Sequence, residues 1–230
     1  MRKHIFLLKR PIESAVADFQ TAMLALRNDD PALPEGCSYV QSHTLPKGYG
    51  RGELMFDVVE EFAFADSRSC DRFRMSAAAA ELFARRMRLA DQQASMAMTV
   101  DVHRVKDGQI SANPVKNIEF VNRRPGMAIA PFRDYWRNIH GPIGSEIPTI
   151  QRYEQNHTVR DAYDDANQPR FDGLAITWFA STAAMRKGAQ SEAYRITRED
   201  EANFLPDGHL PIIIVTEVLQ DLTSSEQEAQ

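Results

Sequence analysis

The chain has few of the features that mark membrane, metal-binding or nucleic-acid-binding proteins. Only two cysteines, Cys37 and Cys70, occur in 230 residues, and their spacing matches neither a disulfide framework nor a zinc site. The net charge is −5, and the densest basic run, at 85–88, is typical of a solvated helix face. No apolar run approaches the roughly 18 to 20 residues that cross a bilayer. We therefore expect no nucleic-acid or membrane partner and a cytoplasmic protein.

Common catalytic motifs are also absent. The sequence contains no glycine-rich phosphate loop and no nucleophile elbow, and the histidines do not show metal-ligand spacing. A metal held by His140, His157 and a distant carboxylate is an open alternative that the spacing does not support. We expect neither a metal nor an organic cofactor.

What the chain does contain is an internal repeat. The segment Tyr39–Thr44 (YVQSHT) returns 114 positions later as Tyr153–Thr158 (YEQNHT), and Phe56-Asp57 returns as Phe171-Asp172. Matches at nearly one offset indicate two copies of one folding unit. The repeat predicts an N-terminal unit at 1–110, a C-terminal unit at 115–222 and a disordered polar tail at 223–230.

Hydrophobic periodicity gives both units the same order of elements. In the first unit it predicts strands at 3–9, 38–45, 53–64 and 96–105 and helices at 12–27 and 77–90. In the second it predicts strands at 116–123, 151–159, 171–179 and 211–219 and helices at 130–140 and 182–197. This β-α-β-β-α-β order is that of ferredoxin-like folds, so the predicted class is α+β. Two tandem sheets can bury their open faces against each other and enclose a cavity.

The second unit holds most of the candidate functional residues. Its first helix places Tyr135, Trp136 and His140 on one apolar stripe, and Gly141-Pro142 is expected to end the helix after His140. The helix dipole would then raise the pKa of His140, whereas burial would lower it. The alternative is a hydrogen-bonded histidine that packs beside a core tryptophan.

Two strands of this unit add further candidates. Tyr153, Gln155 and His157 alternate on one face, which we expect to point to the cavity because buried polar groups need partners. They could equally tie the two sheets together. Asp172 and Trp178 share a face of the next strand, and Asp172 could orient a histidine or cap a turn. The pair Asp200-Glu201, followed by Phe204, is either functional or a solvated helix end.

Four segments of the second unit resemble EthD-domain proteins. They read FRDYWRNIHGP at 132–142, IPTIQRYEQNH at 147–157, FDGLAITWF at 171–179 and DEANF at 200–204. The resemblance covers about residues 115–220 and implies a dimeric α+β barrel, here formed within one chain that could itself form a homodimer. The first unit is similar only in its strands and has Ala22 and Leu26 near the positions of Trp136 and His140, so it looks like a degenerate copy.

The family includes a protein that accompanies ether degradation and fungal dehydratases or decarboxylases of aromatic polyketide pathways. We therefore expect a lyase or isomerase that acts on a hydrophobic, aromatic or oxygenated metabolite. The predicted catalytic residues are His140, His157 and Asp172. The predicted substrate-binding residues are Tyr135, Trp136, Tyr153, Gln155, Asn156, Trp178 and Phe204. The alternatives are an accessory protein that carries an intermediate for an oxygenase and a purely structural module.

Overall fold

The computed structural model describes residues 1–164, 168–208 and 210–221, and the chain divides into two compact units. The first unit contains Met1–Asp101 together with the described residues from Val215 onward, and the second contains Val102–Ile214. The boundaries expected from the repeat, 1–110 and 115–222, stay a prediction. The expected tail at 223–230 lies outside the described residues.

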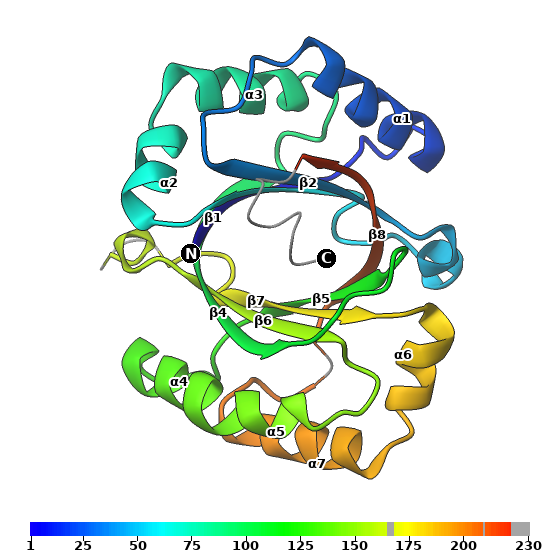
Figure 1. Cartoon of the computed structure of the whole chain (residues 1–230), viewed down its shortest axis with the longest axis vertical. Helices are drawn as coiled ribbons and strands as arrows, with labels where there is room; N and C mark the ends of the chain where they lie inside the picture. The colour runs from blue at the N-terminus through cyan, green and yellow to red at the C-terminus, as the bar shows by residue number, and fades with distance from the viewer. Residues whose placement is uncertain (165–167, 209, 222–230) are drawn as a thin grey trace. The chain divides into compact units, whose positions relative to one another are not determined.

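The two halves of the chain have a similar order of elements (Figure 1), and strands β4 and β8 each cross the boundary between the two units. The N-terminal half runs β1 (Arg2–Leu8), α1 (Val16–Leu26), β2 (Cys37–Thr44), β3 (Val58–Phe64), α2 (Ser67–Arg74), α3 (Ala77–Met87) and β4 (Met96–Asp107). The C-terminal half runs β5 (Val115–Val121), α4 (Ile129–Tyr135), the π-helix η3 (Trp136–His140), α5 (Gly141–Ser145), β6 (Arg152–Thr158), β7 (Gly173–Phe179), α6 (Thr182–Gly188), α7 (Glu192–Asp200) and β8 (Ile212–Asp221). Short 3-10 turns are η1 (Arg27–Asp29), η2 (Pro46–Arg51), η4 (Arg160–Ala162) and η5 (Glu201–Asn203).

The strands pair in an order that closes on itself. Hydrogen-bonded neighbours follow the order β1-β3-β2-β8-β5-β7-β6-β4. The pairs β1–β3, β2–β3, β5–β7 and β6–β7 are antiparallel. The α+β class and the closed antiparallel barrel predicted from the sequence are therefore confirmed. The division into tandem ferredoxin-like units stays a prediction.

Several elements differ from those that the hydrophobic periodicity predicts. The helix expected at 182–197 is two short helices, α6 and α7, and the periodicity does not predict α2. Both α2 and α7 begin at a residue whose side chain caps the helix, since Asp66 accepts from the backbone N–H of Ser69 and Ser191 accepts from that of Tyr194. Capping signals in short segments are easily missed when only apolar spacing is counted.

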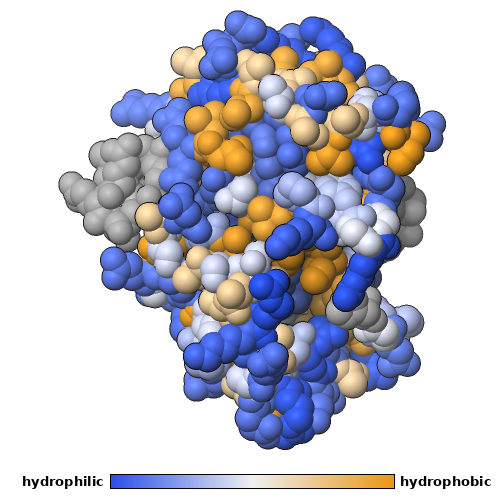
Figure 2. Space-filling view, turned by 90° about the vertical axis from the view of Figure 1, so that its right-hand side faces the viewer, coloured by the Kyte–Doolittle hydropathy of each residue, from blue (hydrophilic) through white to orange (hydrophobic). Residues whose placement is uncertain are grey.

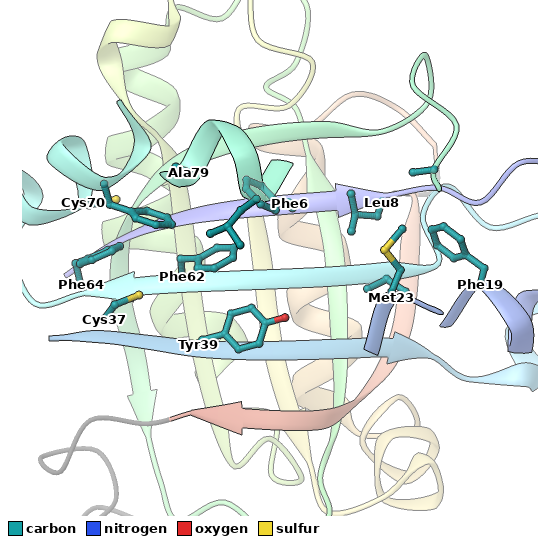
Figure 3. Packing of buried hydrophobic residues seen from close by; sticks show 14 residues of the cluster. Phe6, Leu8, Phe19, Met23, Cys37, Tyr39, Phe62, Phe64, Cys70 and Ala79 are labelled. Atoms are coloured by element: carbon teal, nitrogen blue, oxygen red, sulfur yellow. The ribbon is translucent and has the colours of Figure 1, made fainter. Parts of the chain in front are cut away.

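The core of the first unit lies between its sheet and its helices (Figure 3). Phe6, Tyr39 and Phe62 from β1, β2 and β3 belong to this core, as do Phe19 and Met23 of α1. These side chains are at most 4% exposed. Each strand presents alternate residues to this layer, so the period-two pattern of the sequence builds the core directly.

A buried ion network is embedded in this core. The guanidinium of Arg86 on α3 bonds to Glu60 at 2.8 Å and to Asp30 at 2.5 Å, and its side chain is completely buried. Glu60 also accepts hydrogen bonds from the hydroxyl of Tyr39 at 2.6 Å and from Nε2 of Gln41 at 3.0 Å. A buried charge is tolerated only when such partners are present, so the network fixes α3 against β2 and β3.

Hydrophilic residues cover most of the face seen in Figure 2, with hydrophobic groups between them. Exposed large hydrophobic residues such as Ile12, Met75 and Ile196 come from separate parts of the chain. In the part of the chain that the structure describes, no helix has the length and apolar character needed to cross a membrane.

We predict that Arg86→Met destabilises the protein by about 3 to 5 kcal/mol, because it strands two buried carboxylates. The control is Arg88→Met, which removes an ion pair with Glu81 in which both side chains are exposed and leaves Arg86 in place; its expected cost is below about 1 kcal/mol. Urea unfolding of the two variants measures the difference. Equal losses would mean that the buried network contributes nothing beyond a surface ion pair.

Candidate functional site

The helical segment that carries the candidate histidine contains a π turn. The stretch Trp136–His140 is π-helical, and helix α5 follows without a break. The backbone N–H of Gly141 donates to the carbonyl of Trp136, five residues earlier. Pro142 has no N–H for an ordinary α-helical bond and its ring crowds the preceding turn, which favours a wider turn here. The expectation that Gly141-Pro142 ends the helix is therefore wrong, and His140 lies inside the helical segment.

A close contact with strand β6 accompanies the π turn. Nε2 of Gln155 donates to the carbonyl of Trp136 at 2.6 Å. A Cβ atom on Gly141 would lie 2.7 Å from that nitrogen, and one on Gly173 would lie 2.7 Å from the ring of Trp136. Two glycines therefore allow the helix and the sheet to approach closely at this point.

His140 belongs to a hydrogen-bonded group formed with α7. Its Nδ1 lies 2.8 Å from Oδ2 of Asp200, and the hydroxyl of Tyr135 donates to Oδ1 of the same carboxylate at 2.7 Å. Nδ2 of Asn203 donates to Oδ1 at 3.1 Å. The side chain of His140 is 8% exposed and that of Asp200 is 11% exposed. Among the described residues, Nε2 of His140 has no hydrogen-bond partner.

The surroundings set the protonation of this group. Burial lowers the pKa of His140 below its usual value, and this effect outweighs the opposing hydrogen bond to Asp200. The pKa of Asp200 is also lowered, because the hydrogen bonds from Tyr135, His140 and Asn203 together outweigh its burial. At neutral pH the arrangement is thus a neutral imidazole bonded to a carboxylate. With Nδ1–H donating to Asp200, Nε2 carries the lone pair and can accept a proton.

Aromatic rings surround the imidazole. The ring centroid of Phe204 lies 4.6 Å from that of His140 and 5.5 Å from that of Tyr135. Phe132 lies 5.9 Å from Phe204 and 5.6 Å from Trp136. These rings give His140 the low-polarity environment that lowers its pKa. The structure therefore brings together three residues predicted for the site, namely His140, Tyr135 and Phe204.

The polar trio of strand β6 faces the helices of the second unit. His157 lies against Trp136, with ring centroids 4.5 Å apart, and Gln155 bonds to the helix. The hydroxyl of Tyr153 accepts from Gln155 at 3.3 Å. The expectation that this face points away from the helices is wrong, because helical backbone and ring edges supply partners for polar side chains. His157 and His140 contact different groups on the helical segment.

Asn156 and Trp178 lie on the other face of the sheet. Asn156 alternates with Gln155 and His157 along β6, and its register partner on β7 is Leu174. Trp178 has the amine of Lys116 5.0 Å from its ring centroid and the guanidinium of Arg152 at 5.9 Å. The structure therefore does not bring these two predicted substrate-binding residues together with His140.

Asp172 bonds to the segments that follow strands β5 and β6, and not to a histidine. Its carboxylate accepts from the backbone N–H of Arg123 at 2.7 Å and from the hydroxyl of Tyr163 at 2.8 Å, and it forms an ion pair with the Arg123 side chain. The first unit repeats the pattern, since Asp57 accepts from the backbone N–H of Arg10 at 2.8 Å and from the hydroxyl of Tyr49. The carboxylate beside His140 is Asp200, so the predicted orienting role of Asp172 toward that histidine is wrong.

One cavity of about 450 Å³ opens beside Asp172. Its lining includes Arg123, Arg124, Gln168, Asp172 and the residues of the loop at 125–128, and His140 is not part of it. Among the described residues, no three His, Cys, Asp or Glu side chains are placed to hold a metal ion.

The sequence does not predict that Asp200 bonds to His140. The pair Asp200-Glu201 forms an acidic segment, but a partner sixty residues away from His140 leaves no local signal. Only the packing of α7 against the helical segment reveals the bond.

Comparisons with known proteins support the family resemblance and the fold. Residues 124–207 match the family model of the EthD domain. An anthrone oxidase-like protein superposes with a TM-score of 0.64 at 11% identity, covering 96% of this chain and 92% of its own. A candidate monooxygenase from Lactobacillus acidophilus NCFM gives a TM-score of 0.53 at 15% identity, covering 96% and 94%. A candidate chlorite dismutase gives 0.51 at 11% identity, covering 95% of each chain.

These likenesses establish the fold and leave the reaction open, since the neighbours carry different activities in their descriptions. Comparison with curated protein sequences gives no match.

We predict that His140 titrates below pH 6.5, and that Asp200→Asn lowers its pKa further by removing a charge that favours the imidazolium. Histidine-selective NMR titration measures both values. Asp134→Asn is the matched control, since Asp134 lies exposed on the same helix and bonds to Asn138. A pKa of His140 at or above 6.5, or one that Asp200→Asn raises, would contradict the assignment.

Proposed function

We propose that the second unit is an acid–base enzyme in which His140 removes a proton from a small hydrophobic, aromatic or oxygenated substrate. The observation that carries the proposal is the orientation of the imidazole. Asp200 holds Nδ1 at 2.8 Å while Nε2 has no partner among the described residues. A buried imidazole held in one tautomer by a carboxylate is a common form of general base.

The proposed step follows from this geometry. Nε2 takes a proton from an acidic C–H or O–H group of the substrate, and the electron pair remains on the substrate as a carbanion, enolate or phenolate. Asp200 stabilises the imidazolium that results, and Tyr135 keeps the carboxylate in place. In a dehydration, the imidazolium then gives the proton to the departing hydroxyl group, which leaves as water. In a decarboxylation, it protonates the carbon from which CO2 leaves, and in an isomerisation it returns the proton to another carbon. Imidazole and carboxylate supply this proton transfer themselves, so the step requires neither metal nor organic cofactor.

The rings around His140 support an aromatic or hydrophobic substrate. Phe204, Phe132 and Trp136 form an apolar surround that would favour a flat ring over a charged molecule. A structural neighbour described as anthrone oxidase-like is consistent with an aromatic substrate class. A π turn beside the histidine adds support, because such turns are frequent at functional sites.

We further propose that the chain is a tandem of two ferredoxin-like units, of which the first is a degenerate copy. The repeated sequence and the repeated hydrogen bonds of Asp57 and Asp172 support this origin. At the offset of the repeat, Leu26 stands for His140 and Arg85 stands for Asp200. The first unit therefore lacks both members of the pair, which assigns the chemistry to the second unit.

We predict that His140→Gln reduces turnover by about a hundredfold or more, because it removes the general base while keeping a polar side chain of similar length. Asp200→Asn should reduce turnover by a smaller factor and alter its pH profile. The measurement is steady-state kinetics on substrates found by testing purified protein with phenolic and keto-acid aromatic compounds. His103→Gln is the control, since His103 lies on β4 and outside this group.

Unchanged turnover in His140→Gln would remove this histidine from the mechanism. Tight binding of a compound with no turnover by the native protein would favour the accessory function instead, in which the protein carries an intermediate for another enzyme.

A further inference from the structure

Buried polar atoms that lack partners gather on the helix-facing side of the second unit's sheet. Oε1 of Gln155, Oγ1 of Thr177 and Oδ1 of Asn117 have no hydrogen-bond partner among the described residues. Gln155 is 0% exposed and Thr177 is 9% exposed. Buried polar groups in folded proteins are nearly always bonded, so a group of three on one face needs an explanation. We call these three residues the acceptor cluster.

The strand register places the three residues side by side. Asn117 on β5 stands opposite Thr177 on β7, and Thr177 stands opposite Tyr153 on β6. Gln155 follows Tyr153 by two residues and therefore points to the same face. Three adjacent strands thus direct their unpaired oxygen atoms into one region of the layer between sheet and helices.

The matching region of the first unit is satisfied. Oε1 of Gln41 lies 2.9 Å from Nε2 of His43, and Nε2 of Gln41 donates to Glu60, which in turn bonds to Arg86. At the offset of the repeat, the second unit has Ala175 for Glu60 and Glu201 for Arg86.

The second unit therefore has the glutamine without the ion pair that satisfies its counterpart in the first. A purely structural role gives no reason for an unpaired buried amide oxygen at this position. A ligand group that donates a hydrogen bond does give one.

Carboxylates border the acceptor cluster. Glu119 receives a hydrogen bond from Nδ2 of Asn117 at 3.0 Å, and Glu201 pairs with Arg198 at 2.8 Å. Burial raises the pKa of Glu201 to about 7; Arg198 opposes the rise and Glu119 adds to it. Most of the polar atoms in this region are thus oxygen atoms that accept hydrogen bonds. They favour a ligand whose hydroxyl groups donate hydrogen bonds.

The acceptor cluster lies close to the His140 group. Gln155 bonds to the carbonyl of Trp136 in the π turn, and the charge of Arg198 acts on both His140 and Glu201. We propose that the acceptor cluster anchors the substrate by accepting hydrogen bonds from its hydroxyl groups, so that the substrate class is hydroxylated aromatic compounds. This inference rests on the proposed function, because it assigns the cluster to the substrate of His140.

The test uses substitutions that are expected to leave thermal stability unchanged or higher and to weaken ligand binding. Thr177→Val removes an unpaired hydroxyl with little change of shape, so it should leave thermal stability unchanged or higher. The same substitution should weaken binding of a hydroxylated ligand. A residue with only a structural role would not combine these two results.

The experiment measures binding of β-naphthol, its methyl ether and naphthalene to the full chain by calorimetry. β-Naphthol should bind at least about tenfold more tightly than the methyl ether, which has no O–H to donate. Thr177→Val and Gln155→Met should each reduce this preference. Ser42→Ala is the matched control, because Ser42 carries an unpaired buried hydroxyl in the first unit; it should leave binding unchanged.

Three results would overturn the inference. The native protein could bind β-naphthol and its methyl ether equally well, or it could bind none of the three compounds. Thr177→Val and Gln155→Met could also both retain the native preference for β-naphthol over its methyl ether. His140→Gln separates this result from the proposed function. If His140→Gln loses turnover and still binds β-naphthol more tightly than the methyl ether, both proposals are supported. If it loses turnover and neither it nor the native protein shows that difference in affinity, the role of His140 as general base is supported and the role of the acceptor cluster is contradicted.

Discussion

The close approach of the helical segment 129–145 to strand β6 is the constraint on which the candidate site depends. The bond from Gln155 to the carbonyl of Trp136 and the two glycines, Gly141 and Gly173, permit this approach. With the segment held there, the π turn directs His140 toward Asp200 instead of ending the helix. The orientation of the imidazole is thus a consequence of backbone packing, and the acid–base character of the site follows from it.

The two units show how one fold can serve two purposes. In the first, the layer between sheet and helices is filled by an ion network around Glu60 and Arg86. In the second, the equivalent positions hold Ala175 and Glu201, and the layer contains unpaired acceptors beside a histidine–aspartate pair. Unpaired buried groups of this kind are typical of functional sites, where local stability is lower than it could be.

The sequence predicts the fold better than the site. Runs rich in apolar and β-branched residues place the strands of both units to within about five residues. Strands such as β3 and β7 are buried along almost their whole length, on both faces. Three residues predicted for the site, His140, Tyr135 and Phe204, lie together in the structure, and their function stays a prediction. The orientation of Tyr153, Gln155 and His157 is predicted wrongly, since polarity alone does not reveal that a helix backbone supplies their partners. The carboxylate beside His140 is Asp200 rather than Asp172, and contacts between segments so far apart in the sequence leave no local pattern from which to predict this.

The tautomer of His140 tests the central claim most directly. Nitrogen chemical shifts of the imidazole, recorded on isotope-labelled protein above the pKa of His140, distinguish a proton on Nδ1 from one on Nε2. The structure predicts a proton on Nδ1, donated to Asp200, with Nε2 unprotonated. A neutral imidazole with its proton on Nε2, unchanged by Asp200→Asn, would contradict the account and leave the proposed base without its lone pair.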